Sequence, residues 1–354
     1  MKVALLTSGG DCQGLNPTLR GVAKALYYLV PDVEIYGVEN GYKGLIENRI
    51  RPMSPSDFSG IVRLGGTILG TSRQPFKTMT TEDGLLSEKA KRIIENYRTN
   101  GFDALVVLGG NGTQKTANLL YENGVNVTFL PKTIDNDISG TDLTFGFDSA
   151  VAKATDVIDA VHSTAESHGR VFVVELMGHD VGWIALYSGV AGGADIILIP
   201  EIPYDTERVL DAVRERNKIG KGFTIIAIAE GAMTKEEHSM KKKERAALTD
   251  TAGGRLANSL QEVLRHEDKE VRLVVPGYFL RGGDPTATDR VLCTRLGVKA
   301  AELVAERRFG FMVAEVGQDI VVVRLAEVTG VLKRIGANSQ FVREAKRIGI
   351  VFGD

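Results

Sequence analysis

The chain has 354 residues, of which 43% are hydrophobic, and its formal net charge is -2. This length exceeds that of one ordinary small domain and suits two α/β lobes. The charge argues against nucleic acid held by bulk electrostatics, because backbone binding needs a clear cationic surplus. The longest cationic run, Lys241–Lys243, has glutamate neighbours, which indicates a solvated face.

The two cysteines, Cys12 and Cys293, have no zinc-like spacing and suggest no disulfide framework, so a reducing compartment is favoured. The segment Met1–Thr7 runs into a glycine turn after too few apolar residues for a signal peptide. No uninterrupted apolar segment is long enough to span a bilayer. We therefore expect a cytoplasmic protein with neither a membrane nor a nucleic-acid partner.

Short apolar, β-branched runs recur along the chain between longer helical patterns. Their hydrophobicity is continuous rather than alternating, which is typical of parallel strands buried on both faces by helices. The expected strands are Val3–Leu6, Val33–Val38, Ala104–Leu108, Val125–Leu130, Val171–Leu176, Ile196–Ile199, Thr224–Ala229 and Leu273–Val275. These runs predict an α/β fold with mostly parallel sheets.

Apolar residues also recur at helical spacing, most clearly in a stripe that begins at Phe147 and ends at Val161. The other expected helices are Pro17–Leu29, Lys89–Tyr97, Thr251–Leu264 and one that contains Leu119 and Leu120. A lobe boundary near Gly146 fits this order. No linker-like composition marks it, so we expect the chain to cross between lobes more than once.

The first glycine-rich turn, Ser8–Asp11, follows the first expected strand and precedes a helix. Consecutive glycines let the backbone approach a phosphate, and the next helix offers its positive end. An ordinary tight turn explains this motif alone equally well.

The second turn, Gly109–Thr113, has the same placement after the strand Ala104–Leu108. Asn111 can coordinate through its carbonyl oxygen, although it lacks the carboxylate charge that favours Mg²⁺. Gly112 leaves room for the inner phosphate and ribose of a nucleotide. Because the same arrangement of strand, glycine turn and helix occurs twice, a phosphate-binding loop is favoured over an ordinary tight turn.

The third turn, Pro131–Asp137, delivers Asp135 and Asp137 to a strand end with Thr133 just ahead. A carboxylate directed at a substrate hydroxyl is a suitable general base for attack on phosphorus, and a nearby one can hold a metal. The alternative is that these aspartates cap a helix or close an Asx turn. Lys132 could bind a donor's terminal phosphate or crowd a nucleoside.

Further cationic and polar residues at strand ends suggest an anion site. Converging arginine forks match phosphate oxygens, whereas one such arginine alone is more often a surface ion pair. The candidates are Arg170, Met177, Gly178, His179, Glu230, Arg272, Tyr278 and Arg281.

Taken together, these motifs resemble the phosphofructokinase family from Val3 to about Val323. NAD and diacylglycerol kinases share a turn like Gly109–Thr113 but lack the remainder. The motifs that carry the resemblance are Ser8–Asp11, Gly109–Thr113, Pro131–Asp137, Met177–Gly178, Gly192–Asp195 and Arg281–Pro285.

The resemblance implies two Rossmann-like lobes with the active site in the cleft between them. The phosphoryl-donor lobe would comprise 1–146 and about 281–330, and the sugar-phosphate lobe 147–280 and about 331–354. The implied reaction moves a phosphoryl group from ATP to the 1-hydroxyl of fructose 6-phosphate, with Mg²⁺ as cofactor. The implied assembly is a homotetramer or homodimer with Arg170 and Arg272 contributed across an interface.

The resemblance also implies roles for individual residues. Asp135 would be the base, with Thr133, Asp137 and Lys132 as further catalytic residues, and Asn111 would be the metal ligand. Donor binding would fall to Gly10, Arg73, Gln74, Gly110, Asn111, Gly112 and Thr113. Sugar phosphate would contact Thr133, Asp135, Arg170, Met177, Gly178, His179, Glu230, Arg272, Tyr278 and Arg281.

Four positions depart from the commonest family pattern, namely Asn111, Lys132, His179 and Tyr278. Asn111 replaces a metal-linked aspartate, His179 an arginine and Tyr278 a histidine. Lys132 resembles the lysine of pyrophosphate-dependent members, whereas Gly112 lacks the acid that excludes ATP from them. ATP is the expected donor, pyrophosphate is the alternative, and a non-catalytic regulator is a more distant alternative.

Overall fold

The computed structural model describes residues 1–354 and divides into two compact units. The first unit contains residues 1–149 and 281–332, and the second contains residues 150–280 and 333–354. The chain therefore passes from one unit to the other after Ser149, Leu280 and Leu332.

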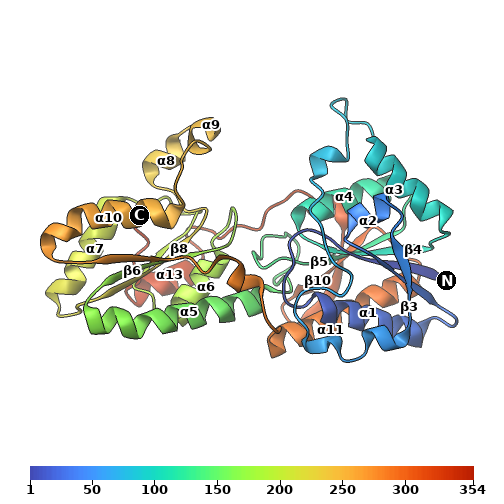
Figure 1. Cartoon of the computed structure of the whole chain (residues 1–354), viewed down its shortest axis with the longest axis horizontal. Coiled ribbons are helices and arrows are strands. Elements are labelled where there is room, and N and C mark those ends of the chain that lie inside the picture. Colours follow the sequence, from blue (N-terminus) through green and yellow to red (C-terminus); the bar gives the residue numbers. More distant parts are fainter. The chain divides into compact units, whose positions relative to one another are not determined.

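The first unit is built on a seven-stranded sheet of order β11-β10-β5-β4-β1-β2-β3 (Figure 1). Its inner strands are parallel, and β3 and β11 each pair antiparallel at an edge. Its strands are β1 (Lys2–Thr7), β2 (Glu34–Val38), β3 (Ile50–Met53), β4 (Ala104–Gly109), β5 (Val127–Pro131), β10 (Phe311–Val316) and β11 (Asp319–Arg324). Its helices are α1 (Leu15–Leu29), α2 (Tyr42–Ile46), α3 (Glu88–Thr99), α4 (Asn111–Glu122), α11 (Ala287–Ala305) and α12 (Leu325–Val328).

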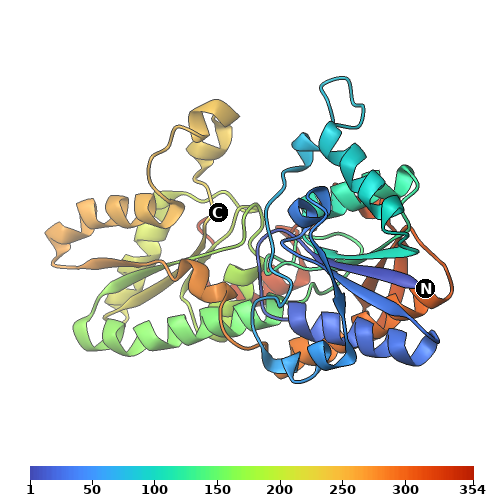
Figure 2. The same ribbon diagram turned by 45° about the vertical axis from the view of Figure 1, so that its right-hand side comes forward.

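Helices cover both faces of this sheet, which explains why β1 and β4 are buried nearly throughout. Figures 1 and 2 show α1 and α11 together on one face and α2, α3 and α4 on the other. Glycines let α1 and α11 approach closely, because a Cβ on Gly297 would lie 2.8 Å from the backbone nitrogen of Val22. A side chain at Gly297 would therefore separate the two helices.

The second unit has a four-stranded, all-parallel sheet of order β7-β8-β6-β9. Side chains of α7 and α10 pack on one face, and Figure 1 shows α5 and α6 on the other. The strands are β6 (Val171–Leu176), β7 (Ile196–Leu198), β8 (Thr224–Ala229) and β9 (Val271–Val274). The helices are α5 (Phe147–His168, which begins in the first unit), α6 (Trp183–Ala191), α7 (Thr206–Lys218), α8 (Lys235–Ser239), α9 (Lys242–Arg245), α10 (Ala252–Leu264) and α13 (Gln340–Arg347).

The predicted α/β class with mostly parallel sheets is confirmed. Every expected strand is present; Val171–Leu176 and Thr224–Ala229 have the expected bounds, and the other six differ by one or two residues at an end. The strand expected from Val125 begins at Val127, and the strand expected at Leu273–Val275 runs from Val271 to Val274. Strands β3, β10 and β11 were not expected from the sequence, and β3 and β11 are the antiparallel edge strands. No helix is long and apolar enough to cross a membrane.

Candidate active site

Three loops meet at one edge of the first unit's sheet, because β5, β4 and β1 are neighbouring parallel strands. The loops that follow these strands therefore leave from the same edge. The chain goes from β1 to β2 on one side and returns to β4 on the other side, so the strand order reverses between β1 and β4. Such a switch point is where open α/β sheets bind ligands.

The loop after β1 is held in place by backbone and side-chain hydrogen bonds. Gly9 has φ +91°, its amide donates to the Ser72 carbonyl at 3.0 Å, and its carbonyl accepts from Thr71 Oγ1 at 2.8 Å. These contacts place the segment that carries Arg73 and Gln74 beside the glycine loop. Arg73 itself is exposed.

Gly10 is closely approached by a guanidinium group. A Cβ on Gly10 would lie only 1.8 Å from Nη1 of Arg281, so a side chain at position 10 would displace that arginine. Arg281 was expected among the sugar-phosphate residues, and the structure places it in the first unit, beside the first glycine loop.

Lys132 also reaches the first glycine loop. Its ammonium donates to the Gly10 carbonyl oxygen, and the side chain is only 4% exposed. Burial is the main cause that lowers the pKa of Lys132; the nearby Arg281 lowers it further, while Asp135 opposes the change. A cation from the end of β5 therefore lies in a low-dielectric position against the loop after β1.

The loop after β4 contains one glycine that has no room for a side chain, Gly109, and one that has free space beside it, Gly112. A Cβ on Gly109 would lie 2.2 Å from the side chain of Thr113, so that turn needs glycine. Gly110 is the N-cap residue of α4. A Cβ on Gly112 would meet nothing within 4 Å, which leaves open space at the start of the helix.

The loop after β5 is braced by its own polar residues. Thr133 Oγ1 accepts from the Asp135 amide at 3.1 Å, and the Thr133 carbonyl accepts from Thr144 Oγ1 at 2.7 Å. Asn136 has φ +53°, and its Oδ1 accepts from the Thr144 amide at 3.0 Å. Thr133, Asn136 and Thr144 thus provide the local turn contacts, while Asp135 and Asp137 remain partly exposed.

Asn111 joins the second loop to the third. Its Nδ2 donates to Asp137 Oδ2 at 2.6 Å, while its Oδ1 is buried and has no hydrogen-bond partner. A buried oxygen without a partner is uncommon and fits one ligand position of a divalent cation. No group of three or more His, Cys, Asp and Glu side chains is arranged to hold a metal ion. Mg²⁺ usually keeps several waters and binds one or two protein oxygens together with substrate phosphates.

In the second unit, the residues after β6 form a turn that is held by Glu230. Glu230 Oε1 accepts from the amides of Gly178 at 3.2 Å and His179 at 2.8 Å. A Cβ on Gly178 would lie 2.5 Å from the Val181 carbonyl oxygen, so this turn requires glycine. The structure therefore brings Met177, Gly178, His179 and Glu230 together, as the sequence suggests.

Arg170 and Arg272 lie elsewhere in the second unit. Both guanidinium groups donate to Glu270, which lies just before β9. Arg170 precedes β6 whereas Met177 follows it, and six strand residues separate them by roughly 20 Å. Within one chain, the two arginines are therefore together but remote from Glu230. Glu270 was not expected from the sequence, in which its position two residues before Arg272 was the available signal.

Tyr278 lies on the short turn Gly277–Arg281 and is 76% exposed. The boundary between the units falls inside this turn, because Leu280 belongs to the second unit and Arg281 to the first. The turn thus carries one expected sugar-phosphate residue in each unit.

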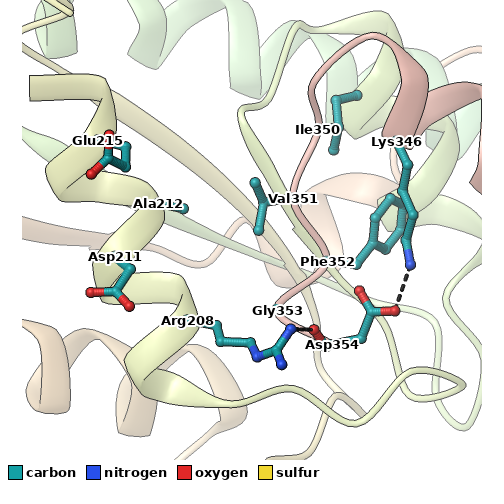
Figure 3. A pocket seen from close by; sticks show the side chains of 10 residues that line it. All are labelled: Arg208, Asp211, Ala212, Glu215, Lys346, Ile350, Val351, Phe352, Gly353 and Asp354. Carbon is teal, nitrogen blue, oxygen red and sulfur yellow. Dashed lines mark hydrogen bonds and ion pairs between the residues drawn. The ribbon is translucent and has the colours of Figure 1, made fainter. Parts of the chain in front are cut away.

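A separate hollow of about 430 Å³ in the second unit lies beside the C-terminal residues of the chain (Figure 3). Its cationic groups are engaged by Asp354: Arg208 donates to the Asp354 main-chain oxygen, and Lys346 pairs with the Asp354 carboxylate. These contacts attach the last residue to α7 and α13. This hollow does not contain any of the expected site residues.

The known proteins that are similar to this chain in sequence are phosphofructokinases. A family profile described as phosphofructokinase matches residues 2–304. An ATP-dependent 6-phosphofructokinase from Spirochaeta thermophila is 49% identical over 99% of this chain and 97% of its own length. ATP-dependent 6-phosphofructokinase 3 from Bacteroides thetaiotaomicron is 46% identical over 100% of both chains.

The fold comparison agrees with these relatives. The structure of phosphofructokinase from Saccharomyces cerevisiae matches 92% of this chain with a TM-score of 0.78 and 29% sequence identity. This chain covers 45% of that longer protein. The similarity therefore concerns a chain about half as long as the yeast one.

Proposed function

The chain belongs to the phosphofructokinase family, and we propose that it transfers a phosphoryl group from ATP to the 1-hydroxyl of fructose 6-phosphate. The product is fructose 1,6-bisphosphate, which makes the protein a glycolytic phosphotransferase. The observation that carries this assignment is the convergence of three loops at the β1/β4 switch point. One loop bears the Gly10 turn, the next Asn111 and open space at Gly112, and the third Asp135.

Asp135 is the general base in this proposal. The Thr133 hydroxyl and the buried Asn136 fix the backbone on both sides of Asp135, so its carboxylate is carried by a rigid turn. The base accepts the proton of the sugar 1-hydroxyl as the oxygen attacks the terminal phosphorus of the donor. Asp137, held by Asn111, lies beside it in the same loop.

Charge stabilisation comes from cations and amides around the first two loops. Lys132 and Arg281 both lie against Gly10, and Arg73 extends from the segment bonded to Gly9. Cations in a buried position are worth more to a transferring phosphoryl group than the same charges in water. The amides of Gly110 to Thr113 lie at the start of α4, where donor phosphates are favoured.

The family requires a divalent metal, and we propose Mg²⁺ with Asn111 Oδ1 as its protein ligand. The metal neutralises donor phosphate charge when it is bound. Asn111 supplies a neutral oxygen, and Asp137 supplies the nearest carboxylate to this amide. The hydrogen bond from Asn111 Nδ2 to Asp137 fixes the orientation of Asn111 Oδ1. In this proposal, that amide oxygen takes the place of a metal-coordinating aspartate oxygen.

Sugar-phosphate binding is proposed for Met177, Gly178, His179 and Glu230 of the second unit. Tyr278 and Arg281 complete the expected set. Since Arg170 and Arg272 lie at the far end of β6 from His179, their proposed role is to reach the sugar phosphate of a neighbouring subunit. This supports a homotetramer or homodimer.

The position of Lys132 favours pyrophosphate as an alternative phosphoryl donor to ATP. Its buried ammonium next to Gly10 is suited to the compact charge of pyrophosphate, whereas the space at Gly112 is suited to a nucleotide. Turnover of fructose 6-phosphate with Mg²⁺, measured separately with ATP and with pyrophosphate, tests the choice. The proposal predicts a kcat/KM at least about 100-fold higher with ATP, a ratio that corresponds to roughly 2.7 kcal/mol. Preferential use of pyrophosphate, or binding of fructose 6-phosphate without turnover, would overturn it.

A further inference from the structure

A second hollow in the second unit, of about 340 Å³, lies among the first turns of α7 and α8 and the face of α10. Its lining is polar and includes Tyr204, Thr234, Glu237, Asp250, Arg255 and Asn258. None of these residues belongs to the phosphoryl-transfer machinery described above. The hollow is within the size range of small-molecule sites.

Tyr204 is the most informative residue of this lining. Its side chain is only 1% exposed, yet its hydroxyl makes no hydrogen bond to another protein group. Its backbone is fixed, because the Tyr204 amide donates to the Met233 carbonyl at 3.1 Å. Burial raises the pKa of Tyr204, so the hydroxyl keeps its proton and remains a donor. Tyr204 lines the hollow, so water or a ligand hydroxyl that enters the hollow can accept this hydrogen bond.

The charges around the hollow disfavour anions. Arg255 is already engaged, because its Nε lies 2.5 Å from Glu237 Oε1, its Nη2 lies 3.2 Å from Glu237 Oε2, and its Nη1 donates to the Asp250 carbonyl. With Arg255 matched by Glu237, the carboxylate of Asp250 leaves the lining with one net negative charge. A phosphate or carboxylate ligand would therefore be repelled.

The remaining hydrogen-bonding groups suit a ligand that both donates and accepts. Tyr204 offers a hydroxyl donor, while the Asp250 carboxylate offers acceptors, of which Oδ2 is used by Asn258 at 3.1 Å. Thr234 and Glu237 cap α8 reciprocally, with bonds of 3.1 Å in both directions, so they form a fixed wall. Neutral hydroxyl groups satisfy donors and acceptors at once, whereas an ammonium ligand has no lone pair for Tyr204.

We propose that this hollow is a binding site for a small, uncharged, polyhydroxylated molecule such as a polyol or an unphosphorylated sugar. One ligand hydroxyl accepts from Tyr204, and a neighbouring hydroxyl donates to Asp250. The site is distinct in chemistry from the phosphate-binding loops, because it contains an engaged arginine and a surplus carboxylate. Its occupancy would hold the first turn of α8 against α10.

Saturation-transfer NMR and calorimetric titration with xylitol as the probe test this proposal. The full-length protein should bind xylitol saturably in the millimolar range, and Tyr204→Phe should weaken binding about three- to tenfold because only one hydroxyl is removed. Tyr36→Phe is the matched control, since Tyr36 donates to Glu34 at the surface of the other unit. Phosphoryl transfer should be unchanged in both variants.

Asp250→Asn provides a second test if Tyr204→Phe fails to fold, which thermal melting without ligand would reveal. Asp250 is exposed, so this change is compatible with folding, and it should also weaken xylitol binding. Two results would overturn the proposal: no saturable binding of xylitol, or equal affinity in the wild type and both site variants. Tighter binding of putrescine or inorganic phosphate that depends on Tyr204 would also overturn it.

Discussion

The side-chain ammonium of Lys132 donates a hydrogen bond to the carbonyl oxygen of Gly10, so a cation from the end of β5 lies against the loop after β1. This contact joins two strand ends that are separated in the sheet by β4. It also gives the proposed donor site a buried positive charge.

Lys132→Met should reduce kcat/KM for ATP about 10- to 100-fold, because it removes a charge-assisted donor while keeping a side chain of similar reach. Steady-state kinetics with ATP at saturating fructose 6-phosphate measures the effect. Lys91→Met is the matched control, since Lys91 pairs with Glu88 at the surface of α3. An unchanged kcat/KM in the Lys132 variant would contradict a role for the ammonium.

Gly112→Asp should abolish most ATP use without harming the fold. A Cβ at this position meets nothing within 4 Å, and an acid in the first turn of α4 is favourable to the helix dipole. The carboxylate would instead repel the donor phosphates, and we expect at least about a 100-fold loss in kcat/KM for ATP.

Gly112→Ala is the control for this change, because it adds a Cβ without charge and should keep most of the activity. Thermal midpoints should be similar for the wild type and both variants. A Gly112→Asp enzyme that retains ATP turnover would show that the open space is not part of the donor site.

Asp289→Asn should destabilise the first unit and change its pH dependence. Asp289 is fully buried on α11 and accepts from the amides of Gly146 at 3.0 Å and Ser149 at 2.9 Å, at the start of α5. Asparagine keeps only one acceptor oxygen, so the loss should be about 1–3 kcal/mol. Thermal melting measures it, with the exposed Asp319→Asn as control.

The pH dependence follows from burial, which is the main cause that raises the pKa of Asp289 to about 6. Between about pH 4 and 6 the native carboxyl holds a proton that the unfolded chain has released. The contribution of Asp289 to the free energy of unfolding should therefore fall as pH rises through this window and stay constant above it. Asp289→Asn should lack this component, and a parallel pH profile in the two proteins would contradict it.

Subunit complementation tests whether Arg170 and Arg272 act across an interface. Arg272→Ala and Asp135→Asn subunits should each be nearly inactive alone, whereas their co-expressed mixture should recover activity in sites that combine an intact Asp135 with a partner's intact Arg272. Arg170→Ala paired with Arg272→Ala should recover less if both arginines serve the same site. Failure of the Arg272 and Asp135 pair to complement, despite mixed oligomers, would place the arginine in its own chain's site.

The sequence was a good guide to the strand ends that carry the candidate site. The continuous apolar runs before Gly109 and Lys132 identify buried parallel strands, and residues just beyond such strands meet at one sheet edge. The edge strand β3 is short and contains Arg51 and Pro52, which hides it in the sequence, whereas β11 carries the apolar run Ile320–Val323 and was overlooked. The pattern along one chain also cannot reveal contacts between distant segments.

The fold altered the expected site in two ways, by one contact and by one separation. Arg281 is far from Gly10 in sequence, and only the fold shows that its guanidinium fills the space a Cβ would take. Arg170 and Met177 flank one strand, so they appear close in sequence although they leave opposite ends of β6. In each case the tertiary position, rather than residue type, decides which groups can act together.

The most direct test of phosphoryl transfer by this site is the comparison of kcat for the wild type and Asp135→Asn with ATP, Mg²⁺ and fructose 6-phosphate. The amide is nearly isosteric but cannot accept the hydroxyl proton, so kcat should fall about 100- to 10,000-fold while fructose 6-phosphate binding changes little. An Asp135→Asn enzyme whose kcat stays within about twofold of the wild-type value would contradict Asp135 as the base.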